Sequence, residues 1–155
     1  MSDDFLKDVR RTMSCYRKSR LALERRFKSG RGAAKISLGQ YTLLAVMDEL
    51  GESTMGTLAK EMGLSLGGLT GLIDRVIDMG FVERFRIPQD RRIVKVKLTQ
   101  KGSETLRAIL EVEEDFATRV LGSVTSEERQ GFVKVLELVV SMELEEEDKL
   151  PEVTQ

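Results

Sequence analysis

The residues best suited to chemistry in this chain are arginines that gather in a short stretch. Arg84, Arg86, Arg91 and Arg92 lie close together in the sequence. A guanidinium keeps its charge at neutral pH, and its planar donors match phosphate oxygens. The cluster therefore predicts contacts to a polyanion such as the backbone of a nucleic acid. The alternative is an ordinary charged hairpin, because Lys and Arg also protect the edges of exposed strands.

A second unusual group lies just before these arginines, in a segment with helical spacing over residues 66–79. Gly67, Gly68 and Gly71 fall inside that helix, where each glycine costs about 1 kcal/mol relative to alanine. We interpret the missing side chains as room for the helix backbone to approach DNA, with Ser65 and first-turn N–H groups near a phosphate. Relaxed selection, or tight packing on a neighbouring helix, is the alternative. The predicted DNA-facing residues of this helix are Ser65, Leu66, Gly67, Gly68, Thr70, Gly71 and Arg75.

Few long polar side chains remain on this face to distinguish one base pair from another. Thr70 can contact a base edge or a thymine methyl group, and Leu66 can add an apolar contact. Arginines at a hairpin tip suit a narrow minor groove, where negative potential is concentrated. We therefore expect DNA shape to contribute to specificity alongside direct contacts. Asp74 and Asp90 are predicted to be structural, each holding an arginine of the hairpin in place.

The spacing of apolar residues and helix caps predicts the elements that carry these groups. Val94, Val96 and Leu98 alternate with lysines, which is the period of a half-buried strand, and 81–86 supplies the opposing strand. Gly63 is expected to adopt a positive φ in the turn before residue 66. Helices are expected at 4–28, 38–50, 55–62, 66–79, 100–121 and 126–147, with capping boxes at Ser37–Gln40 and Thr125–Glu128. The sequence predicts a mainly α fold with a small β-hairpin wing and a winged helix-turn-helix core.

Bulk composition alone would not indicate a nucleic-acid partner. The 155 residues carry a formal net charge of −1 and a sequence pI of about 5.7, although basic residues concentrate near the N-terminus and acidic ones near the C-terminus. The chain has no histidine and a single cysteine, Cys15, so we expect no metal site, no cofactor and no enzymatic activity. Neither a signal peptide nor a membrane span is predicted, and a cytoplasmic protein is the expectation.

Three sequence motifs together resemble the MarR family of multiple-antibiotic-resistance regulators. They are ISLGQYTLLAVM at 36–47, TMGTLAKEMGLSLGGLTGLIDRVIDMGFVER at 54–84 and DRRIVKVKLTQKG at 90–102. The resemblance implies a homodimeric transcription regulator whose helix over 66–79 enters the major groove while the wing reaches the minor groove. It also implies a pseudo-palindromic operator in double-stranded DNA, and release by a small phenolic or anionic ligand or by an oxidant.

The resemblance also assigns the domain organisation. One domain over 1–155 is expected to contain a DNA-binding core at 36–99 and dimerisation helices at 4–28 and 100–147. The apolar surface of those outer helices supports this interpretation independently, because a compact core between them would not cover it. The resemblance further implies an effector pocket between the dimer helices and the core, for which Tyr16, Arg20, Tyr41 and Met47 are candidate lining residues.

Two alternatives to a ligand-released repressor remain. Cys15 lies in the first helix, as the reactive cysteine of peroxide-sensing family members does, with Arg11, Arg17 and Lys18 nearby to favour a thiolate. A small residue at the dimer interface is the competing interpretation of Cys15. The other alternative is a winged helix used for protein contacts, with the acidic last helix as the docking surface.

Overall fold

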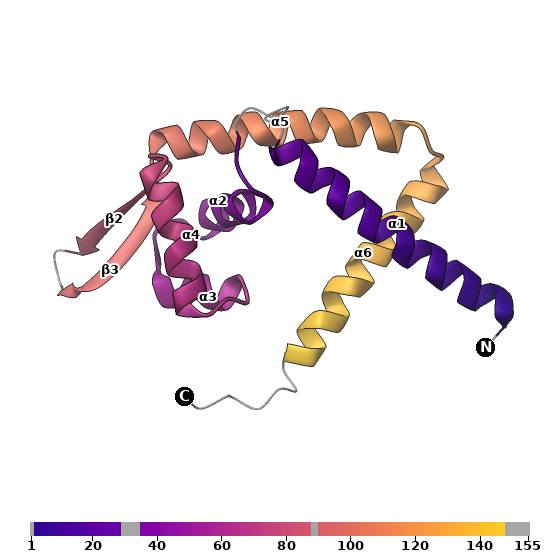
Figure 1. Ribbon diagram of the computed structural model, residues 1–155, viewed down its shortest axis with the longest axis horizontal. Helices are drawn as coiled ribbons and strands as arrows, with labels where there is room; N and C mark the ends of the chain where they lie inside the picture. The colour runs from indigo at the N-terminus through magenta and orange to yellow at the C-terminus, as the bar shows by residue number, and fades with distance from the viewer. Residues whose placement is uncertain (1, 29–34, 88–89, 148–155) are drawn as a thin grey trace. The chain divides into compact units, whose positions relative to one another are not determined.

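The computed structural model describes residues 2–28, 35–87 and 90–147. These residues form α1 (Asp3–Lys28), α2 (Leu38–Leu50), β1 (Ser53–Thr54), α3 (Met55–Glu61), α4 (Leu66–Asp78), β2 (Val82–Ile87), β3 (Asp90–Leu98), α5 (Gln100–Gly122) and α6 (Ser126–Glu147) (Figure 1). The chain falls into two compact units, Met1–Val112 and Glu113–Gln155, and the boundary lies within α5. The mainly helical fold with a small sheet confirms the predicted fold class.

Side-chain caps fix the beginnings of the helices, as the sequence predicts. At α2 the Ser37 hydroxyl accepts the Gln40 N–H at 3.2 Å, and the Gln40 side chain accepts the Ser37 N–H at 2.7 Å. The Thr125–Glu128 box at α6 has the same reciprocal form, with distances of 2.8 and 3.2 Å. Such boxes satisfy two backbone donors that have no partner inside the helix. Both predicted capping boxes are therefore confirmed.

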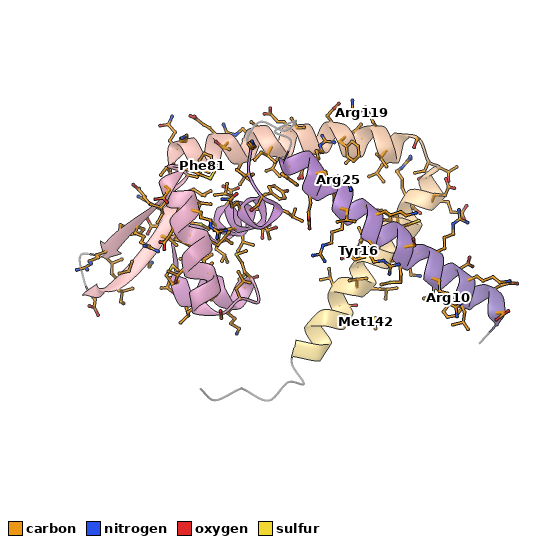
Figure 2. All side chains as sticks on the ribbon, viewed as in Figure 1. Arg10, Tyr16, Arg25, Phe81, Arg119 and Met142 are labelled. Carbon is orange, nitrogen blue, oxygen red and sulfur yellow. The ribbon has the colours of Figure 1, made fainter. Side chains whose placement is uncertain are left out.

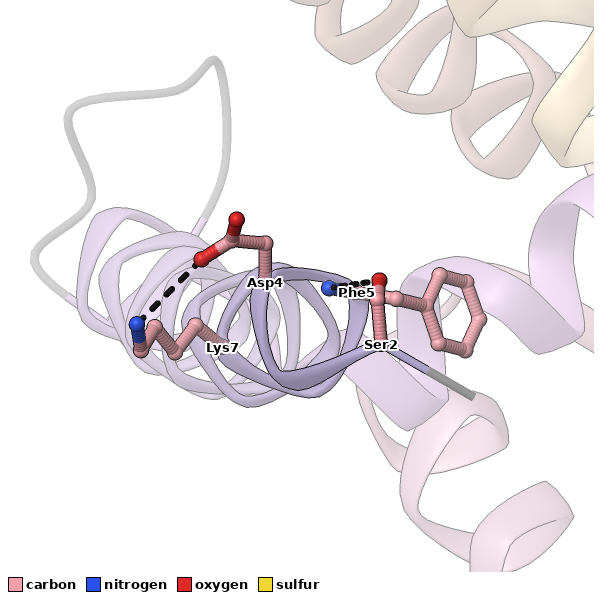
Figure 3. Close-up of polar contacts among 4 residues, drawn as sticks. All are labelled: Ser2, Asp4, Phe5 and Lys7. Carbon is pink, nitrogen blue, oxygen red and sulfur yellow. Dashed lines mark hydrogen bonds and ion pairs between the residues drawn. The ribbon is translucent and has the colours of Figure 1, made fainter.

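The start of α1 is capped in a way that sequence reasoning did not identify. The Ser2 hydroxyl accepts the Phe5 N–H at 3.3 Å, and Lys7 pairs with Asp4 at 3.2 Å one turn along the helix (Figure 3). Asp3 and Asp4 lie in the first turn, where a negative charge interacts favourably with the helix dipole. These contacts begin α1 at Asp3, one residue before the predicted start.

The core of the first unit packs α2, α3 and α4 against the sheet and the first half of α5. Leu69, Ile73 and Val76 of α4 are buried and Leu72 is partly buried, so these residues form the apolar stripe of this helix. The core residues with almost no exposed surface are Leu43, Leu44, Met47, Leu58, Leu69, Ile73, Val76, Val96, Leu106 and Ile109. Because one side of α4 packs into this core, the opposite face of the helix points toward solvent.

The sheet has the order β1-β3-β2 and is antiparallel throughout. Ser53 of β1 pairs with Val96 and Thr54 pairs with Lys95. The sequence analysis did not predict β1, because two residues are too short to show alternation. In β2 and β3, Arg84 faces Val96 and Arg86 faces Val94, and the register shifts between Arg86 and Ile87. The hairpin of β2 and β3 projects beyond the helices of the first unit as the predicted wing (Figure 1).

A dense set of contacts joins the end of α4 to the beginning of α5. Gly80 has a φ of 75°, and the Phe81 N–H donates to the Val76 carbonyl at 2.9 Å, which closes α4. Donors at the beginning of α5 then form hydrogen bonds with three successive carbonyl oxygens. Lys101 Nζ donates to Met79 at 2.8 Å, the Thr99 hydroxyl to Gly80 at 2.7 Å and the Thr99 N–H to Phe81 at 2.9 Å. We call this set of contacts the α4–α5 joint.

Gly102 completes the α4–α5 joint by allowing the two segments to touch. A Cβ atom built on Gly102 would lie 2.0 Å from the carbonyl oxygen of Phe81, so no side chain fits there. Phe81 is buried beside the first turn of α5 (Figure 2). Lys101 Nζ lies over its ring, 5.2 Å from the centroid. The backbone of α5 therefore rests directly on the segment that ends α4.

The second unit contains the end of α5 and the helix α6. Arg129 of α6 donates to the Leu121 carbonyl at 2.9 Å and to the Val124 carbonyl at 2.6 Å, which holds the turn between the two helices. Large apolar side chains along α6 are exposed, among them Phe132, Val135, Leu136, Val139, Val140 and Met142. Figure 2 shows Met142 near the end of the helix. Within the described part of the chain, no helix combines the length and apolarity that crossing a membrane requires.

Candidate nucleic-acid interface

The outward face of α4 is exposed along its whole length. Ser65 caps the helix by accepting the Gly68 N–H at 3.2 Å, and Leu66 is 59% exposed. The Thr70 hydroxyl donates to the Leu66 carbonyl at 2.7 Å, which leaves its oxygen lone pairs directed away from the helix as acceptors. The structure exposes every residue predicted for this face: Ser65, Leu66, Gly67, Gly68, Thr70, Gly71 and Arg75.

The glycines of α4 have no packing reason to be glycine within the described residues. A Cβ atom built on Gly67 or Gly71 would meet nothing within 4 Å, and one on Gly68 would meet only the Ser65 hydroxyl at 3.4 Å. Gly102 shows the opposite situation, because a carbonyl oxygen fills the space of its Cβ. Close packing on a neighbouring helix therefore does not explain these three glycines. Their effect is a bare strip of helix backbone on the protein surface, which we call the glycine face.

The wing has two chemically different sides, because alternate residues of a strand point to opposite faces. Arg84 and Arg86 share the side of Val82 and Val96, both of which are buried. The lysines of β3 lie on the other side: Lys97 pairs with Glu83 at 3.3 Å and lies over the Phe85 ring, and Lys95 faces Phe85. The strand cations therefore do not form one surface.

Arg84 of the wing forms an ion pair with a residue of α4. Its Nη2 atom lies 2.7 Å from Asp74 Oδ1, and both side chains are partly exposed, at 39% and 50%. This is a short distance for a charge-assisted hydrogen bond. Asp74 thus contacts an arginine of the wing, and Arg84 sits at the root of the hairpin instead of at its tip.

The tip of the wing is described only in part. Asp90 is exposed and begins β3, where it pairs with Ile87. The backbones of Arg91 and Arg92 follow in β3, but their side chains, together with Pro88 and Gln89, lie outside the described residues. The predicted DNA contacts of Arg91 and Arg92, and the predicted bracing role of Asp90, therefore stay predictions.

The four candidate effector residues occupy two different environments. Met47 is 1% exposed and belongs to the core, and Tyr41 stacks on Phe27 with ring centroids 5.0 Å apart. Tyr16 lies on α1 (Figure 2) and is 59% exposed. Arg20 of the same helix pairs with Glu24 at 3.7 Å. Tyr16 precedes Phe27 by about 16 Å along the axis of that helix. This offset places Tyr16 away from the Phe27–Tyr41 ring pair, and the effector pocket stays a prediction.

Cys15 is exposed on α1. Exposure leaves the thiol accessible to an oxidant in the described chain, but nothing else in its surroundings distinguishes a sensor from an interface residue. The redox hypothesis and the interface hypothesis for Cys15 both stay predictions.

The sequence analysis did not identify the residues at the beginning of α5 that hold the end of α4. The Thr99 hydroxyl caps α5, because it accepts the Gly102 N–H at 3.0 Å. Its second contact, to Gly80, and the roles of Lys101 and Gly102 were not anticipated. A glycine in the first turn of a predicted helix is the signal that could have identified the close approach at Gly102.

The profile of the MarR family matches residues 36–94 of this chain, which run from two residues before α2 into β3. Residues 36–94 of the chain therefore belong to the MarR family. The relative YfiV of Bacillus subtilis (strain 168), named as an uncharacterized HTH-type transcriptional regulator, is 32% identical over 104 residues. That alignment covers 67% of this chain and 65% of YfiV, so the chain spans just under two thirds of this relative.

Solved structures of MarR-family proteins show the same fold. A MarR family protein from Bacillus stearothermophilus has a TM-score of 0.75 and 23% identity, covering 93% of this chain and 99% of its own. A mutant MarR from E. coli, complexed with operator DNA, has a TM-score of 0.67 and 25% identity, covering 88% of this chain and 96% of its own. The agreement extends over the helices on both sides of the family match.

Proposed function

We propose that this MarR-family chain is a homodimeric transcription regulator that binds a pseudo-palindromic operator and acts as a repressor. The glycine face of α4 is the observation that carries the proposal. Exposed glycines in a helix reduce stability, and nothing in the described chain requires them. Glycines at these positions would allow the helix backbone to enter a deep groove of a binding partner. The major groove of DNA is wide enough to admit a helix.

The N-terminus of α4 supports a phosphate contact beside the groove. Ser65 uses its hydroxyl on the Gly68 N–H, so other N–H groups of the first turn remain directed outward. Donors at a helix N-terminus interact favourably with an anion, and the helix dipole adds to this. Such a contact sets the register of the helix on the duplex without reading sequence.

The wing supplies cations on the side away from the lysine-bearing face. Arg86 is exposed, and among the described residues it makes no ion pair. Arg91 and Arg92 follow within the same hairpin in the sequence. We propose that these arginines reach the minor groove next to the site of α4, where a narrow groove concentrates negative potential.

The apolar side chains exposed outside the DNA-binding core support homodimerisation. On α6 these include Val133, Leu136 and Val140, which line a shallow hollow together with Glu137 and Ser141. On α1, Phe5, Val9, Met13, Tyr16 and Leu21 are also exposed. Exposed apolar area of this extent marks an interaction surface in a soluble protein. A two-fold dimer would place two copies of α4 on two half-sites, in keeping with a pseudo-palindrome.

The similar MarR from E. coli was crystallised with operator DNA, which supports a DNA partner for this chain. Release by a small phenolic or anionic effector rests on the family resemblance, with Tyr16, Arg20, Tyr41 and Met47 as candidates. Tyr41 stacks on Phe27 near the end of α1, whereas Tyr16 and Arg20 lie earlier on that helix. Tyr16 and Arg20 would therefore act in a different part of the pocket or through the partner protomer.

Selection of duplexes from random-sequence DNA by the full-length protein tests this function. We expect an enriched pseudo-palindrome whose affinity falls steeply with rising salt, because cations that neutralise phosphates release counterions. Arg86→Ala, Arg91→Ala and Arg92→Ala should each weaken binding. Arg107→Ala is the matched control, since Arg107 is an exposed arginine on α5 outside the proposed interface.

The opposite result favours the protein-docking alternative. If no duplex is enriched and affinity for DNA is negligible at moderate salt, the DNA-binding proposal is wrong. Addition of candidate phenolic and anionic compounds to the enriched duplex complex then tests release. Transcription from a promoter that carries the enriched sequence distinguishes repression from activation.

A further inference from the structure

The ion pair between Asp74 and Arg84 connects α4 to the root of the wing. The two residues are ten positions apart, one in the third turn of α4 and the other near the start of β2. The 2.7 Å contact joins Arg84 Nη2 to Asp74 Oδ1 across the surface of the first unit. Between α4 and the wing, the described residues show this ion pair, whereas the Lys97–Glu83 pair lies within the wing.

Asp74 lies on the same side of α4 as Leu66 and Thr70, because residues four apart in a helix share a face. If that side meets DNA, as the proposed function requires, the Asp74 carboxylate comes near phosphate oxygens. An unpaired carboxylate would repel them, and the repulsion would weaken binding at any sequence. Arg84 neutralises this charge with its own, so the pair presents no net charge to the duplex.

Arg84 and Arg86 differ although they lie on one side of one strand. Arg84 faces Val96 near the core and contacts Asp74, whereas Arg86 is two residues closer to the tip and faces Val94. The charge of Arg84 is already matched inside the protein. The charge of Arg86 remains available to a phosphate.

We propose that Arg84 is a positioning residue and not a phosphate contact. The Asp74–Arg84 pair sets the wing relative to α4 and hides the carboxylate, so that α4 and the wing meet adjacent grooves together. This role rests on the proposed function, since it gives the pair a part in DNA recognition. Arg86, and not Arg84, then supplies the phosphate contact from β2.

The test compares Arg84→Gln, Asp74→Asn, the double variant and Arg86→Gln in the full-length protein. The probe is the duplex that the wild-type protein selects from random-sequence DNA, and affinity is measured over a range of salt concentrations. We expect each single change in the pair to weaken binding about fivefold, the upper range for an exposed ion pair. The double variant should bind no more weakly than Arg84→Gln alone, because the two residues act together.

The salt dependence separates positioning from a phosphate contact. The Asp74–Arg84 pair carries no net charge, and the double variant replaces it by two neutral amides. The slope of log affinity against log salt should therefore keep its wild-type value in the double variant. Arg86→Gln should lower the magnitude of that slope by about 0.9, the contribution of one phosphate contact. A purely structural role would leave both slope and affinity of the folded protein unchanged, and near-ultraviolet circular dichroism establishes that each variant is folded.

Three results would overturn the proposal. Tighter binding by Asp74→Asn would show that a released Arg84 reaches a phosphate. A loss of about 0.9 in slope for the double variant would show the same. Wild-type affinity in both folded single variants would remove the pair from recognition. If the wild-type protein selects no duplex at all, the proposed function fails instead, so the two failures are distinguishable.

Discussion

The hydroxyl of Thr99 donates to the carbonyl oxygen of Gly80 at 2.7 Å, and this bond ties the beginning of α5 to the residue that ends the candidate recognition helix. The same hydroxyl accepts the Gly102 N–H at 3.0 Å, so one side chain serves both helices. With Lys101 on Met79 and the Thr99 N–H on Phe81, each carbonyl from 79 to 81 has a donor from α5. The α4–α5 joint therefore anchors the end of α4 to the beginning of α5.

Thr99→Val should destabilise the fold by about 1–2 kcal/mol, because it removes a helix cap and leaves the Gly80 carbonyl without its donor. Urea unfolding followed by circular dichroism measures the change. Thr42→Val is the matched control, since the Thr42 hydroxyl is exposed and bonds only within its own helix, to Leu38 at 3.0 Å. The control should change stability by less than about 0.5 kcal/mol. Equal effects of the two substitutions would contradict the joint as a distinct stabilising element.

Gly102→Ala should destabilise the protein by about 3 kcal/mol or prevent folding, because the new Cβ would meet a backbone carbonyl that cannot move aside. Gly131→Ala on α6 is the control, as a Cβ there meets nothing within 4 Å. The control should be neutral or slightly stabilising. A Gly102→Ala protein with wild-type resistance to urea would show that α5 does not rest on Phe81 as described.

Gly67→Ala should raise stability by up to about 1 kcal/mol and weaken binding of the selected duplex by about tenfold, or about 1.4 kcal/mol. The opposite signs follow because the added methyl group favours the helix but keeps the backbone away from DNA. Gly39→Ala provides a matched control: Gly39 is also the second residue of its helix, follows a serine cap and a leucine, and has open space at its Cβ. It should stabilise similarly without changing DNA affinity. Unaltered affinity in Gly67→Ala would remove the close-approach explanation of the glycine face.

The Thr125 backbone N–H, and next the Thr125 side chain, hold the pKa of Glu128 below its ordinary value of 4.5. The unfolded chain therefore takes up a proton at higher pH than the folded chain. The stabilisation from the Glu128 charge is fully present above pH 4.5 and disappears as pH falls through the lowered pKa of the folded state. Glu128→Gln keeps an acceptor without the charge, so it should be less stable than wild type at neutral pH. Unfolding free energies measured from neutral to acidic pH should converge, and a gap that stays constant would contradict this assignment.

Val140→Lys should convert the proposed dimer to a monomer while leaving the folded monomer intact. Val140 is 60% exposed in the single chain, so lysine costs nothing there, whereas burial against a partner would enclose a charge. Sedimentation velocity measures the change, and Gln130→Lys, an exposed polar position on α6, serves as the control. Truncation after Val124 should have the same effect as Val140→Lys. A Val140→Lys protein that remains dimeric at low micromolar concentration would place the interface elsewhere.

Much of the fold could be predicted because its signals are local. Apolar spacing and side-chain caps located the helices to within one or two residues, and Gly63 adopts the predicted positive φ, at 60°. β2 is displaced by one residue from its predicted bounds because the Phe81 N–H closes α4 and cannot begin a strand. β1 depends on a partner strand far along the chain, and its two residues carry no pattern of their own.

The site could be predicted as a surface but not as a set of contacts. The outward side of α4 follows from the buried stripe, so the exposure of Thr70 and Gly71 needed only helical periodicity. The partner of Arg84 depends instead on the angle at which the wing leaves α4, which no local pattern encodes. The register between β2 and β3 places Lys97 beside Glu83, on the side away from Arg84 and Arg86, and no pattern within a single strand gives that pairing.

The glycine face also bears on how such regulators diverge. Because open space surrounds Gly67 and Gly71, a single substitution can introduce a base-reading side chain without displacing any atom of the interior. The operator preference of a descendant can therefore change while its core sequence stays the same. In this chain, the surface that we propose selects DNA and the packing that maintains the fold can evolve separately.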